Sequence, residues 1–166
     1  MAFPEDLREQ ACHLARRDPK RPRQASLRRA VSTAYYALFH LLITETTRNW
    51  KRPAERFVLA RMFEHAFMAK ACNIKRDALN ALFKTSPPKS GGLDVDKHLH
   101  VVAETFVRML QHGHTADYDS STKWTRTDTL ETIDSVQAAF QSWRAIRTGH
   151  EAQNFLVTLL LRERKP

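Results

Sequence analysis

Apolar residues recur at helical spacing along most of the chain. Pro4 followed by two acidic residues is typical of a helix start, and the pattern that follows ends at Pro19. After a basic linker over residues 20–24, the most apolar stripe of the chain occupies residues 27–42. The spacing predicts a short amphipathic helix over residues 4–17 and a longer, more deeply buried helix after it.

A third helical pattern begins at Pro53 and continues to Cys72, and residues 78–83 extend it as a short helix. Two prolines and two glycines within residues 85–92 then predict a loop. The next helical pattern begins near Asp94. It is expected to end at Gly113, because glycine suits the left-handed conformation that often follows a helix C-terminus.

The last third of the chain predicts a loop and two more helices. The loop covers residues 115–126, and Asp128 with Glu131 has the spacing of a capping box that opens a helix ending near Ile146. A final helix is expected over residues 151–164. Four glycines in 166 residues are too few for the turns of a β-sandwich or barrel. The chain is therefore expected to be all-α: an antiparallel bundle of four to six helices in a single domain, residues 1–166.

The charge balance points to a polyanionic partner. The 27 Lys and Arg residues against 18 Asp and Glu give a formal charge of +9. Positive charge concentrates in residues 16–29 and 48–76, whereas residues 94–131 carry more acidic than basic side chains. One basic and one acidic surface are expected, and RNA or DNA is a natural ligand for the first.

Several other classes are disfavoured. No apolar stretch approaches the length of a membrane span, and no leader segment opens the chain, so a cytoplasmic protein is expected. Cys12 and Cys72 are too few for a disulfide framework. Phosphate-binding glycine loops and CxxC pairs do not occur, and His112 with His114 has no third metal ligand nearby in the sequence. No cofactor and no metal site is expected.

Arginine with histidine is the combination that metal-free RNA cleavage needs, because imidazole moves a proton and guanidinium stabilises phosphorane charge. Arg61 and His65 are four residues apart, as are Arg108 and His112, so each pair is expected to share a helix face. Arg108 and His114 form a third pair, with His114 just beyond the predicted helix end. The same spacings also arise among solvated surface side chains that have no catalytic role. The catalytic and the noncatalytic interpretation of each pair therefore both stay open.

Two segments resemble a known family. Residues 28–40, with the sequence RRAVSTAYYALFH, look like the opening helix motif of the HEPN superfamily, the higher-eukaryote and prokaryote nucleotide-binding domain. Residues 116–119, with the sequence ADYD, look like that superfamily's element between its last core helices. The resemblance implies a HEPN-like core over about residues 25–147. The helices over 4–17 and 151–164 would be additions to that core.

Members of this superfamily are four- or five-helix bundles that usually form homodimers. Many are metal-independent endoribonucleases of toxin–antitoxin or defence systems that use an Arg-x4-6-His motif. The resemblance assigns catalysis to Arg108, His114 and His112, with supporting roles for a second set: Asp117, Tyr118, Tyr36 and His40. Tyr36 and His40 are expected to be packed, hydrogen-bonded core residues.

A noncatalytic function is the alternative. Many superfamily members only bind or assemble, and Met109 follows Arg108 where many active members carry a polar residue. In that case the protein would be a helical interaction module that binds a protein partner such as a nucleotidyltransferase-like antitoxin. RNA or a nucleotide is the ligand expected for the catalytic interpretation.

Overall fold

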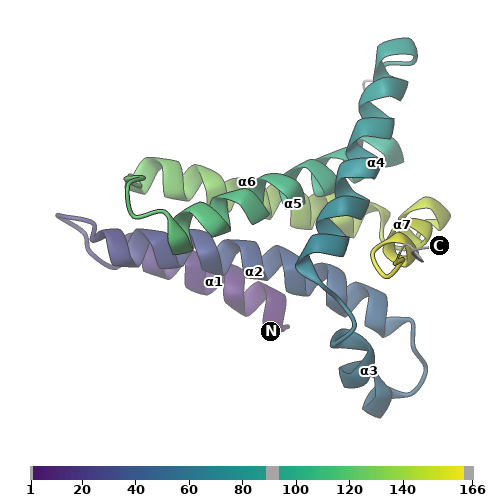
Figure 1. Ribbon diagram of the computed structural model, residues 1–166, viewed down its shortest axis with the longest axis horizontal. Coiled ribbons are helices and arrows are strands. Elements are labelled where there is room, and N and C mark those ends of the chain that lie inside the picture. The colour runs from purple at the N-terminus through teal and green to yellow at the C-terminus, as the bar shows by residue number, and fades with distance from the viewer. Residues whose placement is uncertain (1, 89–93, 163–166) are drawn as a thin grey trace. The chain divides into compact units, whose positions relative to one another are not determined.

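The computed structural model describes residues 2–88 and 94–162, and every regular element within these ranges is a helix (Figure 1). The described ranges contain seven helices and no strand: α1 (Phe3–Arg16), α2 (Gln24–Arg48), α3 (Pro53–Ala60), α4 (His65–Thr85), α5 (Val95–Tyr118), α6 (Arg126–Ile146) and α7 (His150–Thr158). The all-α expectation is confirmed. The helix count exceeds the predicted four to six, because the third expected helix is two separate helices.

The chain divides into two compact units. Unit 1 comprises the residues up to Leu41 together with Thr105–Phe140, and unit 2 comprises Leu42–Glu104 together with the residues from Gln141 onward. The long helices α2, α5 and α6 each contribute residues to both units.

Unit 1 is built around the first part of α2, which is buried on almost every side. The rings of Phe3 in α1 and His40 in α2 meet edge to face at 5.0 Å, so α1 runs antiparallel to α2. The buried Tyr35 ring packs against Phe106 of α5 at 5.9 Å. Burial of apolar side chains on both flanks explains why this stretch of α2 is the most apolar in the sequence.

The start of α6 is joined to the start of α2 by a reciprocal pair of hydrogen bonds. The Gln24 side chain donates to the carbonyl of Trp124 (2.7 Å), and its oxygen accepts the backbone N–H of Trp124 (3.0 Å). Leu27, Val31 and Ala116 form a buried cluster with the Trp124 side chain. Trp124 thereby anchors the loop between α5 and α6 onto α2.

Unit 2 contains a buried polar contact between the end of α2 and the end of α6. The indole N–H of the fully buried Trp143 donates to Glu45 at 3.0 Å. Glu45 also pairs with Arg48 (2.9 Å) and Arg147 (3.4 Å). This carboxylate is therefore buried with its charge compensated, which is the arrangement that a buried acid requires.

The single helix predicted from Pro53 to Cys72 is wrong. Helix α3 ends at Ala60, residues 61–64 leave the helical path, and α4 begins at His65 and continues without a break through residues 78–83 to Thr85. Phe63 is buried in this break, whereas no residue of α3 is buried. Instead of continuing helix α3, the chain turns at this break and buries the aromatic ring of Phe63. Residues 89–92 of the predicted loop lie outside the described residues.

Three other predicted boundaries also change. Helix α5 does not end at Gly113 but continues to Tyr118, so the following loop covers only residues 119–125. The cap of α6 is Thr125 rather than Asp128. The Thr125 hydroxyl accepts the backbone N–H of Asp128 (3.1 Å) and donates to its carboxylate (2.6 Å). Helix α7 ends at Thr158, and residues 163 and 164 of the predicted last helix lie outside the described residues.

Candidate functional site

The candidate catalytic residues lie on the second half of α5, in unit 1. Gly113 is buried within the helix, and a Cβ atom at this position would lie 3.4 Å from the ring of Tyr35. Its role is therefore close packing of α5 against α2, not helix termination. Because α5 continues, His114 is an exposed helical residue and not a loop residue beyond a helix end.

Helical geometry separates the two predicted arginine–histidine pairs of α5. At about 100° per residue, Arg108 and His112 project about 40° apart, whereas Arg108 and His114 project about 120° apart. Arg108 is exposed and makes no ion pair with any residue in the described ranges. Within one chain, Arg108 and His112 therefore form the pair, and His114 faces a different direction.

His112 sits in an unusual environment for an imidazole. It is half-buried, its ring meets the ring of Trp124 edge to face at 5.6 Å, and its Nδ1 is buried without a hydrogen-bond partner in the described part of the chain. Desolvation lowers the pKa of His112 below its ordinary value of 6.5, and the neighbouring Arg108 cation lowers it further. His112 is consequently a neutral imidazole at neutral pH, the form that accepts a proton.

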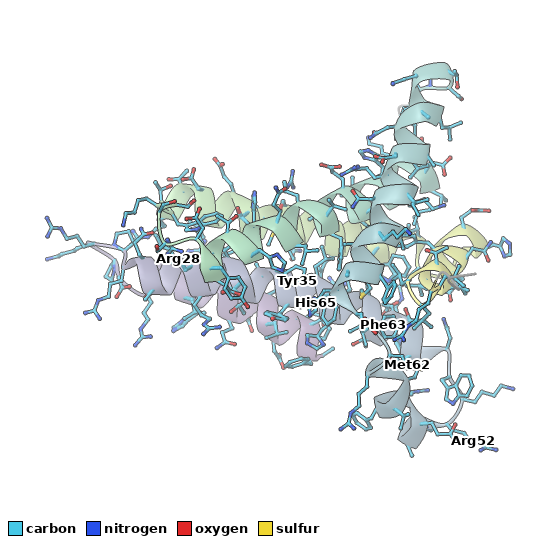
Figure 2. All side chains as sticks on the ribbon, in the orientation of Figure 1. Arg28, Tyr35, Arg52, Met62, Phe63 and His65 are labelled. Atoms are coloured by element: carbon cyan, nitrogen blue, oxygen red, sulfur yellow. The ribbon has the colours of Figure 1, made fainter. Side chains whose placement is uncertain are left out.

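Arg28 of α2, which is labelled in Figure 2, holds the C-terminus of α5. Its guanidinium donates to the carbonyls of Ala116 (3.0 Å), Asp119 (2.7 Å) and Thr122 (2.5 Å). These are carbonyls that a helix end and the turn after it leave without partners. Arg28 is thus a helix cap, a role that its position in a basic stretch of the sequence does not indicate.

The two aspartates of the ADYD segment have different roles. Asp117 accepts a hydrogen bond from the buried hydroxyl of Ser32 at 3.0 Å, which ties α5 to α2. Asp119 accepts bonds from the backbone and hydroxyl of Ser121 and from the hydroxyl of Thr122. These bonds lower the pKa of Asp119 to about 2. Asp119 is therefore a turn residue, whose carboxylate satisfies the N–H and hydroxyl groups of the loop after α5.

The expectation that Tyr36 and His40 belong to the core is wrong for Tyr36. Tyr36 is 38% exposed, and His40 is half-buried between the rings of Phe3 and Phe39. Ser32, Tyr36 and His40 are spaced four apart, so they share one face of α2. The core side of this segment is formed instead by Tyr35 and the other buried residues of α2. Tyr118 is 84% exposed at the end of α5, where its ring lies 6.1 Å from that of His114.

The rival pair Arg61 and His65 does not share a helix. Arg61 is the residue after the end of α3. His65, which is labelled in Figure 2, is the first residue of α4. The interpretation from their spacing required one continuous helix, and the break at residues 61–64 removes it. Both residues belong to unit 2, whereas Arg108, His112 and His114 belong to unit 1.

The two basic stretches also differ. In residues 48–76, Arg48, Arg52 and Arg76 form ion pairs with carboxylates, and Arg56 donates to the carbonyls of Arg48 and Trp50. In residues 16–29, only Arg23 pairs with Asp18. The exposed cations of this stretch that form no ion pair with any described residue make up what we call the unit 1 basic surface: Arg16, Arg17, Lys20, Arg21 and Arg29.

Within residues 2–88 and 94–162, no group of three or more His, Cys, Asp or Glu side chains is arranged to hold a metal ion. No helix in these ranges combines the length and apolarity of a membrane span. Comparisons with protein-family models, curated proteins and solved structures find no match for the chain.

Proposed function

We propose that this protein is a HEPN-like RNA-binding protein that cleaves RNA without a metal ion, as the ribonuclease component of a toxin–antitoxin or defence system. The observation that carries the proposal is the Arg108–His112 pair of α5. An exposed guanidinium lies beside an imidazole whose pKa is lowered by burial and by that guanidinium. Together they supply a proton acceptor and a charge-stabilising cation, two of the groups that RNA transesterification uses.

The proposed reaction is an in-line attack by the 2′-hydroxyl on the adjacent phosphorus. Neutral His112 takes the 2′-hydroxyl proton, the new P–O2′ bond forms, and Arg108 stabilises the charge that accumulates on the phosphoryl oxygens. The P–O5′ bond then breaks, and the leaving oxygen receives a proton. The products are a 2′,3′-cyclic phosphate and a 5′-hydroxyl end.

His114 is the proposed proton donor, contributed by a second copy of the chain. It projects about 120° away from Arg108 around α5, so the two groups of one chain lie on different faces of the helix. A homodimer that brings two α5 helices together would place the His114 of one copy beside the Arg108 and His112 of the other. This arrangement is the reason to propose that the active form is a dimer.

RNA binding is assigned to the unit 1 basic surface. Its five cations are exposed, lie in the same unit as Arg108 and His112, and are close together in the sequence. Each phosphate contact would release condensed counterions, so affinity should fall steeply as the salt concentration rises. Reversing Arg17 and Arg21 to Glu should weaken binding equally for unrelated RNA sequences.

The test is cleavage of a labelled structured RNA by the purified protein in EDTA. Arg108→Ala and His112→Ala should each slow cleavage by about 10² to 10⁴. Their combination should cost little more than either alone, since both destroy one site. Arg61→Ala and His65→Ala are matched controls that should retain full activity. The assignment fails if the wild-type protein cuts no RNA, or if both α5 variants keep the wild-type rate.

The dimer is tested separately by light scattering at tens of micromolar protein in moderate salt. Mixing Arg108→Ala chains with His114→Ala chains should restore part of the activity, because some mixed dimers then contain one complete composite site. A monomer in light scattering, or no restoration on mixing, contradicts the shared site.

A second candidate function is a noncatalytic module that docks on a protein partner such as a nucleotidyltransferase-like antitoxin. It is favoured by α3, of which no residue is buried, and whose Phe57 and Val58 are 78% and 67% exposed. Exposed apolar patches of this kind commonly mark protein interfaces. This candidate predicts no RNA cleavage, and binding to such a partner in calorimetry that Phe57→Ser weakens and Arg108→Ala does not.

A further inference from the structure

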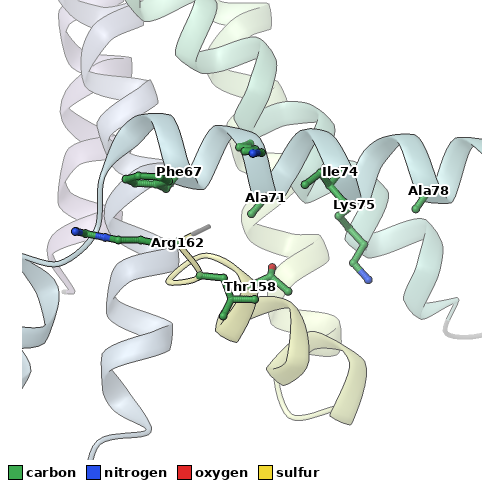
Figure 3. Close-up of a pocket in the computed structure, with 9 residues that line it drawn as sticks. Phe67, Ala71, Ile74, Lys75, Ala78, Thr158 and Arg162 are labelled. Atoms are coloured by element: carbon green, nitrogen blue, oxygen red, sulfur yellow. The ribbon is translucent and has the colours of Figure 1, made fainter. Parts of the chain in front are cut away.

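Unit 2 contains an open groove between α4 and the C-terminal part of the described chain. Figure 3 shows it, with α4 on one side and Thr158 and Arg162 on the other. Its volume is about 570 Å³. The floor is apolar, formed by Phe67, Ala71, Ile74 and Ala78 of α4 together with Leu161.

The floor has the dimensions of a helix-binding site. Its α4 residues recur at intervals of four, three and four, so they form one straight stripe along that helix. From Phe67 to Ala78 this stripe is about 16 Å long at 1.5 Å per residue, the length of three helical turns. Ile74 is 61% and Leu161 63% exposed, so the described residues leave this apolar surface uncovered. A helix packed along α4 would cover it.

The edges of the groove are cationic. Lys70, Lys75 and Arg162 line it, and none of its nine lining residues is acidic. Arg162 is held in place by an ion pair with Glu64 (2.6 Å) and by the Phe67 ring, whose centroid lies 5.4 Å from the guanidinium carbon. An apolar floor with basic edges is complementary to a ligand that is apolar on one face and acidic on both flanks.

We propose that this groove binds an acidic amphipathic helix of a protein partner. Leucine-type side chains at helical spacing would enter the space over Ile74 and Leu161, and flanking carboxylates would pair with Lys75. A helix fits better than a compact small molecule because the apolar floor follows a straight stripe of α4, and Ile74 in the stripe and Leu161 beside it are more than half exposed. The proposal concerns unit 2 alone and does not depend on RNA cleavage by α5.

The probe is a synthetic helical peptide with a leucine stripe flanked by glutamates. Two control peptides replace either all flanking glutamates by lysine or all leucines by serine. The readout is the NMR spectrum of protein labelled at isoleucine δ1 methyls. The chain has four isoleucines, and Ile74 is exposed whereas Ile43, Ile133 and Ile146 are buried. The acidic leucine peptide should shift the Ile74 methyl, and each control peptide should bind at least about tenfold more weakly.

Variants connect the binding to the groove. Ile74→Asp should reduce affinity for the acidic peptide by about tenfold or more, because a charge would replace an apolar contact. Lys75→Glu should weaken the acidic peptide and strengthen the lysine peptide. Lys20→Glu, the same charge reversal on the unit 1 basic surface, should change neither by more than about twofold. All three positions lack full burial, so the variants should fold.

Four outcomes would overturn the proposal. The Ile74 methyl could stay unmoved by the acidic peptide, or Lys20→Glu could weaken binding as much as Lys75→Glu does. A shift that follows protein concentration without peptide would assign the groove to a second copy of the chain. A shift produced by vesicles of anionic phospholipid, but not by the peptide, would assign it to a lipid surface.

Discussion

Replacing Arg28 by alanine should destabilise the protein strongly, although the residue lies within a basic segment that resembles a nucleic-acid contact. Its guanidinium donates to three carbonyls at the end of α5 and in the turn after it, at distances of 2.5 to 3.0 Å. Arg28→Ala would leave all three acceptors without this donor. It would also remove a cation from the negative end of the helix dipole.

The loss in the free energy of unfolding caused by Arg28→Ala follows from these three contacts. A hydrogen bond to a charged group contributes about 1.5 to 3 kcal/mol, but here three bonds share one partly exposed cation that also loses hydration. We therefore expect a loss of about 3 kcal/mol in the free energy of unfolding, or roughly 6 to 12 °C in Tm for a chain of this size. Arg28→Lys should lose about half as much, because one ammonium group cannot span three carbonyls.

The assay is urea unfolding followed by circular dichroism, with Arg29→Ala as the matched control. Arg29 is the exposed neighbour in the same helix, so its removal should change the free energy of unfolding by no more than about 0.5 kcal/mol. RNA affinity should show the opposite order, with Arg29→Ala weakening binding in the folded protein. If Arg28→Ala costs no more stability than Arg29→Ala, the capping role is wrong.

Three further predictions concern protonation and the buried contact of unit 2. By NMR titration, His112 should have a pKa below 6.5, and Arg108→Gln should raise this pKa by removing a neighbouring positive charge. An unchanged pKa in Arg108→Gln would show that the Arg108 cation does not act on His112. The stabilising hydrogen bonds to ionised Asp119 should be lost as the pH falls from about 4 to about 2, the interval between its unfolded and folded pKa values. Asp119→Asn should flatten this part of the acid-unfolding curve. Trp143→Phe should lower the free energy of unfolding by about 1 to 3 kcal/mol, because Glu45 loses a buried donor; calorimetry showing no change in Tm would contradict this.

The periodicity of apolar residues is enough to predict that the chain is helical and where its most buried helix lies. Apolar residues at helical spacing predict α2 and most of α6 correctly, because a helix that buries one face must repeat its apolar positions every three to four residues. Spacing also identified that Arg108 and His112 share a face, since that follows from the geometry of any α-helix.

Local signals failed where a tertiary contact decided the outcome. Gly113 is a plausible helix terminator in the sequence, but the ring of Tyr35 lies against its missing side chain, and α5 continues through it. The apolar pattern after Pro53 continues past Ala60, yet the helix stops and Phe63 is buried in the break. The local sequence shows neither that Tyr35 packs against Gly113 nor that Phe63 is buried.

The role of each charged residue depends on which neighbours the fold brings to it. Arg28 and Arg29 are adjacent and chemically identical in the sequence, but α2 directs the first to the carbonyls at the end of α5 and the second to solvent. The pKa of His112 likewise depends on burial beside Trp124, which is twelve residues away along the chain. Charge counts give the number of cations, whereas the fold determines which are consumed by carbonyls and carboxylates and which remain available to a ligand.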